Sequence, residues 1–421
     1  MQKNLPLPAK IMHWGIAALL IAMPFHAFAV IALGNFIGGQ QIWQAWKEVL
    51  SLGLIGLSVY VFLQSRRRNY VFDTANISAC ILIVFGVLLT LSARVPLVQA
   101  LFGVKVVVLP LVLFGTVQLA RVRFDKEFLT KAILWPAYIV AVIAILQEFI
   151  IPLSWWSFIG YGEATIRPLQ LVDPAVQSIR AFATLGGPNQ LGAYMILPTL
   201  LGLVLAIKKR RIYYALGALL TFAAVVVSFS RSAWLGLSVA GVAAIVIYGN
   251  RMVRMLVAVA VSIAAIAILA LGSSLPARLQ NTQIQYFLLH GRYSQTQEIE
   301  GSDFGRLQSL NRATSAIADH PWGNGLGTAG PASFRSDKPF ITENWYLQIA
   351  IEIGVIGVVL FLIFFGANII GLIRSQNVLW QALAAVVCGL LVTNLFLHAW
   401  ADSTLGIMIF SLLGLAKVDK S

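Results

Sequence analysis

The sequence predicts an all-α integral membrane protein with about twelve transmembrane helices and a large outer loop that contains short helices. Of its 421 residues, 59% are hydrophobic and only 11% are charged, whereas a soluble domain carries about 25% charged residues. Apolar runs recur along the chain, each long enough to cross about 30 Å of hydrocarbon as a helix. Only helices and closed barrels satisfy their backbone polar groups in lipid, and continuous rather than alternating apolarity selects helices.

The apolar runs divide the chain into two helical parts around one polar interval. Nine helices are predicted within 1–272, an outer loop in 273–343 and three helices within 344–421. Because many spans follow it, we expect the first apolar run to be a retained helix, although Ala27-Phe28-Ala29 imitates a signal-peptide cleavage site. The predicted spans are 11–34, 47–64, 74–92, 97–119, 132–151, 190–207, 212–229, 233–249, 255–272, 345–373, 378–396 and 399–416.

The distribution of Lys and Arg predicts the orientation. With the N-terminus inside, every inside connection is basic, as in Arg66-Arg67-Arg68 and 208–211, and short cytoplasmic loops do hold the excess of basic residues. Both termini are then cytoplasmic, and the polar interval faces outside. We interpret the net charge of +14 as this topology signal and as contact with membrane lipids, and we expect no nucleic-acid partner.

No pattern in the chain predicts a metal or a cofactor. The two cysteines, Cys80 and Cys388, both lie within apolar runs, so neither a disulfide framework nor a metal cluster is expected. The glycines of 325–330 match G-x-G-x-x-G, but no strand is predicted before them, so we interpret them as a glycine-rich turn. Walker A, HExxH and GxSxG sequences do not occur.

The outer loop is predicted to contain an amphipathic helix that lies against the membrane face, because its apolar residues recur at helical spacing. These residues are Phe304, Leu307, Leu310, Ala313 and Ile317.

Two arginines are candidates for gripping a phosphate group at the outer face. Arg180 precedes a span whose start is marked by Gly186-Gly187-Pro188-Asn189, and Arg231 lies in a short turn between two spans. An arginine at the interface binds phosphate bidentately and keeps its charge. The alternative is that each side chain only anchors its helix at the lipid headgroups.

Other ionisable residues lie near the outer ends of the predicted spans. Glu343 and Asn344 precede the span at 345–373, where Glu343 is either a proton acceptor or a helix cap. His398 and Asp402 lie at the last outer turn and form a reserve pair for proton transfer. Lys105 lies within a span, where it either pairs with a buried acid or touches a diphosphate.

Four phrases resemble the O-antigen ligase and O-antigen polymerase superfamily. RAFATLGGPNQLGAYM from Arg180 resembles the family's "R…GTF-x-NPN-x-LG-x-Y", and SFSRSAWLGL from Ser228 resembles its second arginine phrase. ADHPWGNGLGT resembles "HP-x-x-G-x-GLG", and ENWYLQIAIEIGVIG from Glu343 resembles "HN-x-YL…E-x-G-x-x-G". The phrases keep the family's order on the predicted twelve-span frame.

The resemblance implies a membrane glycosyltransferase like the type C enzymes, active on the outer (periplasmic) face of a bacterial inner membrane. It would take a glycan from undecaprenyl diphosphate, without metal or cofactor, and place it on an acceptor hydroxyl of a glycan, lipid or protein. Arg180 and Arg231 match the two arginines that hold the lipid diphosphate. We predict Arg180, Arg231 and Glu343 as catalytic residues and Asn189, Asn344, Lys105, His398 and Asp402 as substrate-binding residues.

The chain departs from the family phrase at one position. The family's ligases have a histidine as the proposed base immediately before the asparagine that matches Asn344, and this sequence has Glu343 there. A glutamate accepts a proton less readily than a histidine. An O-antigen ligase-like function is therefore the main prediction, a polymerase of lipid-linked repeat units is the alternative, and a flippase or other transporter is a second class.

Overall fold

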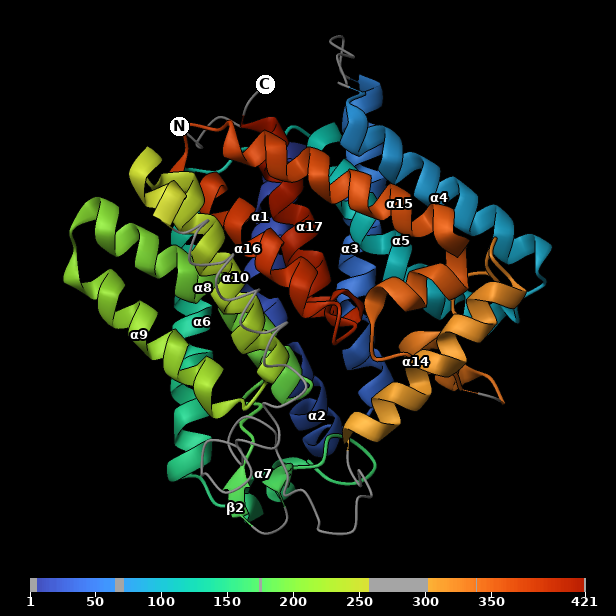
Figure 1. The fold of residues 1–421 in the computed structure, drawn as a ribbon, viewed down its shortest axis with the longest axis horizontal. Helices are drawn as coiled ribbons and strands as arrows, with labels where there is room; N and C mark the ends of the chain where they lie inside the picture. Colours follow the sequence, from blue (N-terminus) through green and yellow to red (C-terminus); the bar gives the residue numbers. More distant parts are fainter. Residues whose placement is uncertain (1–5, 65–71, 174–175, 257–301, 338, 420–421) are drawn as a thin grey trace.

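The computed structural model describes residues 6–64, 72–173, 176–256, 302–337 and 339–419, and these form a helical bundle with one small hairpin. The short strands β1 (Leu171–Asp173) and β2 (Val176–Ile179) pair antiparallel. Figure 1 shows the ends of the chain at the top and α7 with β2 at the bottom. The helices are α1 (Leu7–Ala22), η1 (Met23–Phe25), α2 (His26–Phe36), α3 (Gln40–Gln64), α4 (Thr74–Ser92), α5 (Leu97–Leu119), α6 (Lys126–Phe149), α7 (Leu153–Ile159), α8 (Pro188–Lys209), α9 (Ile212–Val227), α10 (Arg231–Tyr248), α14 (Ser302–Asp319), η2 (Gly330–Arg335), α15 (Trp345–Ile373), α16 (Val378–Thr393), η3 (Ala399–Ala401) and α17 (Ser403–Val418).

The helices confirm the predicted membrane spans wherever the chain is described. In the described parts of the chain, eight helical segments are long and apolar enough to cross a membrane, with α1 to α2 (Leu7–Phe36) counted as one. Three shorter apolar helices, α9, α16 and α17, coincide with further predicted spans. The predicted span at 255–272 lies almost wholly outside the described residues. The protein is therefore a predominantly helical, multi-pass integral membrane protein.

A capping residue sets the start of α6 away from the predicted boundary. α6 begins at Lys126 rather than 132, because the Asp125 carboxylate accepts hydrogen bonds from the N–H groups of Glu127 and Phe128. Such a cap satisfies backbone donors that the first turn leaves unpaired. The polar first turn lowers the local hydropathy, so hydropathy alone places the start later.

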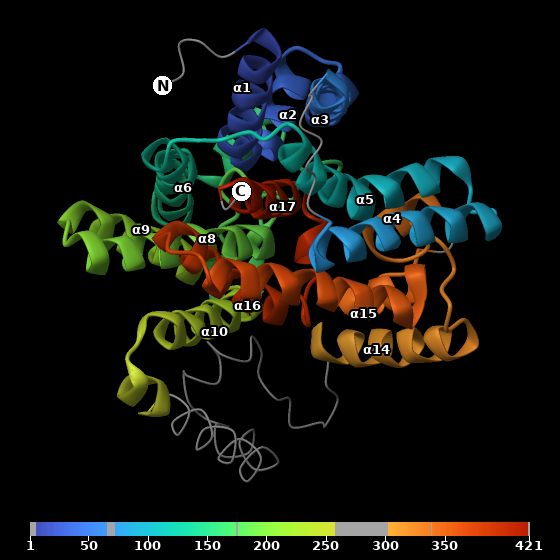
Figure 2. The ribbon, with the colours of Figure 1, turned by 90° about the horizontal axis from the view of Figure 1, so that it is seen from above.

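The helix α17 lies at the centre of the bundle (Figure 2). Nearly all of its residues are buried, and it packs most extensively along α5. Gly414 allows the two backbones to approach, because a Cβ there would lie 2.6 Å from the carbonyl oxygen of Phe114. The buried aromatic side chains Phe364, Phe365 and Phe410 complete this core.

The predicted amphipathic segment of the outer loop is the helix α14, which packs beside α15 (Figure 2). Ala313 is fully buried against Ala329 and Ile351. Part of the apolar face of α14 is therefore covered by the bundle itself.

Candidate functional site

The Arg180 side chain is held between the start of α8 and the turn between α9 and α10. Its Nη2 donates to Asn189 Oδ1 at 2.8 Å, and its Nε donates to the carbonyl oxygen of Ser228 at 3.3 Å. The adjacent backbone is tied to the same turn, since Ala181 N–H donates to the Val227 carbonyl at 3.0 Å. These bonds give the guanidinium one defined position.

Arg231 is the first residue of α10 and belongs to the turn that Arg180 contacts. The turn needs a left-handed backbone at Phe229, with φ of 48°, and Ser228 Oγ accepts from Ser230 N–H at 3.3 Å. α8 approaches closely at Gly192, where a Cβ would lie 2.9 Å from Ser228 Oγ. Two arginines that are 51 positions apart in the sequence are thereby attached to one turn.

A cavity of about 420 Å³ lies at the start of α8, and neither Arg180 nor Arg231 is among the described residues that line it. Four of the residues predicted as site residues line it: Asn189, Glu343, His398 and Asp402. Asn189 joins this cavity to Arg180 through the hydrogen bond described above. The sequence interpretation missed Gln190, Pro331 and Ser403, which also line the cavity. Each directly follows a residue or phrase that the sequence did single out.

The segment before α15 brings Glu343 to the cavity. Trp345 N–H donates to the carbonyl oxygens of Asn394 and Leu397 at 3.0 and 3.1 Å, which fastens the start of α15 beside His398. Glu343 itself has a left-handed backbone, with φ of 50°. A residue other than glycine adopts this conformation at a cost and often does so at functional sites.

Asn344, and not Glu343, caps α15. Its Oδ1 accepts from the N–H groups of Tyr346 and Leu347 at 2.9 and 3.1 Å, and its Nδ2 donates to the Leu395 carbonyl at 2.8 Å. Asn344 therefore performs the helix-capping role that the sequence left open for the Glu343 carboxylate. Both the oxygen and the nitrogen of the Asn344 amide have hydrogen-bond partners within the protein. Contact between Asn344 and substrate stays a prediction.

His398 and Asp402 flank the short helix η3 at the cavity. Burial lowers the pKa of His398, and the charge of nearby Glu343 opposes this shift. A lowered pKa favours the neutral imidazole, and its buried Nδ1 has no hydrogen-bond partner among the described residues. Asp402 Oδ1 caps α17 by accepting from Leu405 N–H at 3.1 Å.

Lys105 does not line this cavity. Its Nζ lies 2.6 Å from Glu48 Oε1, and Lys47 Nζ lies 3.3 Å from the same oxygen. Lys47 also lies 2.6 Å from His26 Nε2. Lys105 therefore forms an ion pair with an acidic residue, which was one of its two predicted roles. Its contact with a diphosphate stays an untested prediction.

The helix α15 is broken at Gly354, and the glycine-rich loop at 321–330 supplies hydrogen-bond partners for the backbone groups that the break leaves without helical partners. At Gly354 the helix has φ of 78°, and the carbonyl oxygens of Ile351 and Glu352 instead accept from the N–H groups of Asn324 and Gly325 at 2.8 and 2.9 Å. Val355 N–H donates to the Pro321 carbonyl at 3.1 Å. The loop is a turn with left-handed glycines, as predicted, and it leads directly to Pro331 on the cavity wall.

The partner of Glu352, which the sequence did not identify, is this loop. The side chain is fully buried, and its Oε1 accepts from Gly327 N–H at 3.0 Å. We expect Glu352→Ala to destabilise the protein by about 1–3 kcal/mol, because a buried donor is left without an acceptor. Hydrogen exchange measured by mass spectrometry should be faster at 325–329 in this variant. Glu352→Gln keeps an acceptor oxygen and is the control; unchanged exchange in Glu352→Ala would contradict this role.

Among the described residues, no group of three or more His, Cys, Asp or Glu side chains is placed to hold a metal ion. Among the described residues that line the cavity, the ionisable groups are the carboxylates of Glu343 and Asp402 and the imidazole of His398. The Arg180 guanidinium is connected to this lining through its hydrogen bond to Asn189.

The fold and the cavity define a multi-pass membrane protein with a polar site where several helices begin. The family model described as O-Antigen ligase matches residues 216–362, which include Arg231 and Glu343. An O-antigen polymerase of Salmonella muenchen is 25% identical over 344 residues, covering 76% of this chain and 80% of that protein. Together with the four sequence phrases, these matches support the O-antigen ligase and O-antigen polymerase superfamily for this chain.

Proposed function

We propose that this protein transfers a glycan from undecaprenyl diphosphate to an acceptor hydroxyl on the outer face of a bacterial inner membrane. One observation carries the proposal: the cavity that holds Glu343, His398 and Asp402 adjoins Asn189, which in turn holds Arg180 beside the turn of Arg231. A diphosphate needs fixed cations, an acceptor hydroxyl needs a proton acceptor, and this site supplies both.

The arginines act on the leaving group. As the bond between the anomeric carbon and the phosphate oxygen breaks, its electron pair passes to the diphosphate. Guanidinium groups that are already positioned at a boundary of low dielectric stabilise this charge more than water does. Arg180 is positioned in this way by Asn189 Oδ1 and the Ser228 carbonyl. The proposed mechanism assigns no step to a metal.

Glu343 receives the proton of the acceptor. The hydroxyl oxygen forms the new bond to the anomeric carbon, and its proton passes to the carboxylate. Glu343 lines the cavity, and Asn344 already performs the capping task that would otherwise compete for its carboxylate. His398, whose pKa is lowered by burial, is the alternative acceptor.

The helix directions support a single outer site. The helices α8, α10, α15 and α17 all begin at the site residues. These four helix starts support a site on the outer side, because basic residues follow the opposite ends of the same helices in the predicted orientation. We propose that the site faces the periplasm and that both termini are cytoplasmic.

A polymerase that joins lipid-linked repeat units is the second candidate, because the relative described above is an O-antigen polymerase. The transferred bond and leaving group are the same in both functions, and only the acceptor differs. A transporter would need a continuous polar path through the bundle, whereas the central helix α17 is buried along nearly its whole length. This packing favours transfer.

The proposal is tested with purified protein, undecaprenyl-diphosphate-linked glycan and separate candidate acceptors. We expect release of undecaprenyl diphosphate together with a glycan–acceptor product, both identified by mass spectrometry. Growth of the lipid-linked glycan by whole repeat units would assign the polymerase function. If reconstituted protein moves the intact lipid-linked glycan across the vesicle membrane and no glycan–acceptor product forms, the proposed glycan transfer is wrong.

A further inference from the structure

A second and larger cavity, of about 1210 Å³, lies at the opposite end of the helices that begin at the candidate site. α15 and α17 start at that site and end at this cavity, where Arg374 and Lys417 line it. α17 has 16 residues, so the two sites are separated by about 24 Å along the helix. The cavity is therefore distinct from the proposed transfer site.

The rim of this cavity is basic. Among the described residues that line it, four side chains are cationic, namely Arg121, Lys126, Arg374 and Lys417, and two are anionic, Asp73 and Asp419. Lys417 pairs with Asp73, and Lys126 Nζ lies 3.7 Å from Asp419 Oδ2. The lining thus contains two more positive than negative side chains, and Arg121 and Arg374 are exposed at its edge.

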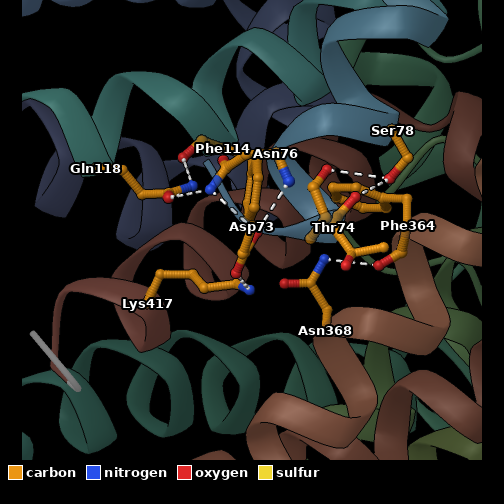
Figure 3. A network of polar contacts seen from close by, with 10 residues as sticks. Asp73, Thr74, Asn76, Ser78, Phe114, Gln118, Phe364, Asn368 and Lys417 are labelled. Carbon is orange, nitrogen blue, oxygen red and sulfur yellow. Dashed lines mark hydrogen bonds and ion pairs between the residues drawn. The ribbon is translucent and has the colours of Figure 1, made fainter. Parts of the chain in front are cut away.

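A polar network holds one wall of this cavity in place (Figure 3). Asp73 caps α4 by accepting from Asn76 N–H at 3.0 Å, and Asn76 Nδ2 donates to Gln118 Oε1 at 3.2 Å. Gln118 Nε2 donates in turn to the Phe114 carbonyl at 3.0 Å. Figure 3 shows Lys417 reaching Asp73 from α17, so three helices are joined at this wall. These contacts fix the positions of the polar side chains that line this wall.

The other wall is an apolar face of α15 that leads to Arg374. Ile363, Gly366, Ala367 and Ile370 line the cavity at helical spacing, and the side chains of Ile363 and Ile370 are 42% and 52% exposed. At Gly366 an added Cβ would meet no atom within 4 Å. The cavity therefore combines a groove as long as two helical turns, suited to a hydrocarbon chain, with a cationic rim at one end.

We propose that this cavity binds one anionic phospholipid. Its phosphate lies at the rim formed by Arg121 and Arg374, and one acyl chain lies against the α15 face between Ile363 and Ile370. Basic pockets between membrane helices bind anionic headgroups in this way. The apolar wall distinguishes a lipid phosphate from a phosphate compound in solution, which would use the rim alone. The proposal is independent of glycan transfer.

The charge of the rim is tested by titrating purified full-length protein in a neutral detergent with phosphatidylglycerol, followed by native mass spectrometry. The double variant Arg121→Gln/Arg374→Gln should bind this lipid about tenfold or more weakly, since each basic residue contributes on the order of 1 kcal/mol to anionic-lipid attraction. Arg211→Gln removes an exposed arginine that does not line the cavity and should bind normally. Equal binding by the wild type and the double variant would overturn the proposal.

The apolar wall is tested separately by Gly366→Leu. An added Cβ at Gly366 meets no atom within 4 Å, and leucine has a higher helix propensity than glycine, so the variant should fold. Its side chain adds bulk to the face that carries Ile363 and Ile370, so phosphatidylglycerol should bind several-fold more weakly. Gly241→Leu in α10, another glycine with no atom within 4 Å of an added Cβ, is the matched control. Unaltered binding by Gly366→Leu would refute the acyl-chain contact. Displacement of the lipid by inorganic pyrophosphate alone would reassign the cavity to a soluble phosphate compound.

Discussion

Replacing Arg180 or Arg231 by alanine is expected to lower the rate of glycan transfer by about 10²-fold or more. The expected size follows the loss of one fixed donor to a developing anion. Arg180 is held at two points, Asn189 Oδ1 and the Ser228 carbonyl, so its guanidinium is oriented before the lipid diphosphate binds. The measurement is the rate of undecaprenyl diphosphate release by purified protein at saturating acceptor.

Two controls separate this effect from a loss of folding. Arg167→Ala removes an exposed arginine that pairs with Glu163 in the same region between α7 and α8, and it should leave transfer unchanged. Arg180→Lys keeps the charge but loses the planar fork, so it should recover only part of the activity. If the alanine variants keep their thermal stability and transfer at the normal rate, the proposed leaving-group role is wrong.

Glu343→Gln is expected to lower transfer by about 10²-fold or more, because the amide cannot accept the proton of the acceptor hydroxyl. Glutamine has nearly the same size, so the cavity and the cap formed by Asn344 should persist. His398→Asn is the companion variant, since His398 lines the same cavity. Full activity in Glu343→Gln combined with loss in His398→Asn would move the proton acceptor to the histidine.

The pH dependence distinguishes the same two residues. Burial holds the pKa of His398 below its usual value of about 6.5, and Glu343 opposes that shift. A histidine acceptor must be neutral, so activity would fall as the pH drops through this lowered pKa. Removing the Glu343 charge would lower the pKa further and move the acid limb to lower pH. With Glu343 as the acceptor, Glu343→Gln should instead be weakly active at every pH.

Hydropathy and charge in the sequence predicted the membrane helices because the bilayer imposes a length and a polarity on each span separately. The start of α8 was equally readable, since Gly187 and Pro188 stand at its first positions, as expected for a helix that begins at proline. The start of α6 could not be predicted from hydropathy, because Asp125 caps a polar first turn that does not count as part of an apolar span.

The candidate site was predicted as separate phrases, and its assembly needed the tertiary structure. Glu343 shares a cavity with His398, and the hydrogen bonds of Trp345 and Asn344 to carbonyl groups at 394–397 hold the two segments together. The sequence predicted a glycine-rich turn at 325–330, but only the structure shows that this loop fills the break of α15 at Gly354 and donates to the Glu352 carboxylate. Lys105 is a comparable case, since nothing along its own helix indicates that Glu48 is its partner.

The sequence by itself determined that this chain forms membrane helices, where most of them lie and which residues are too polar for lipid. Each of these properties follows from the free energy of a short segment in a bilayer. Only the tertiary structure decided which polar residues share a cavity and that a second cavity lies at the far ends of α15 and α17. Such contacts depend on how helices pack against one another, and that packing is a property of several distant segments together.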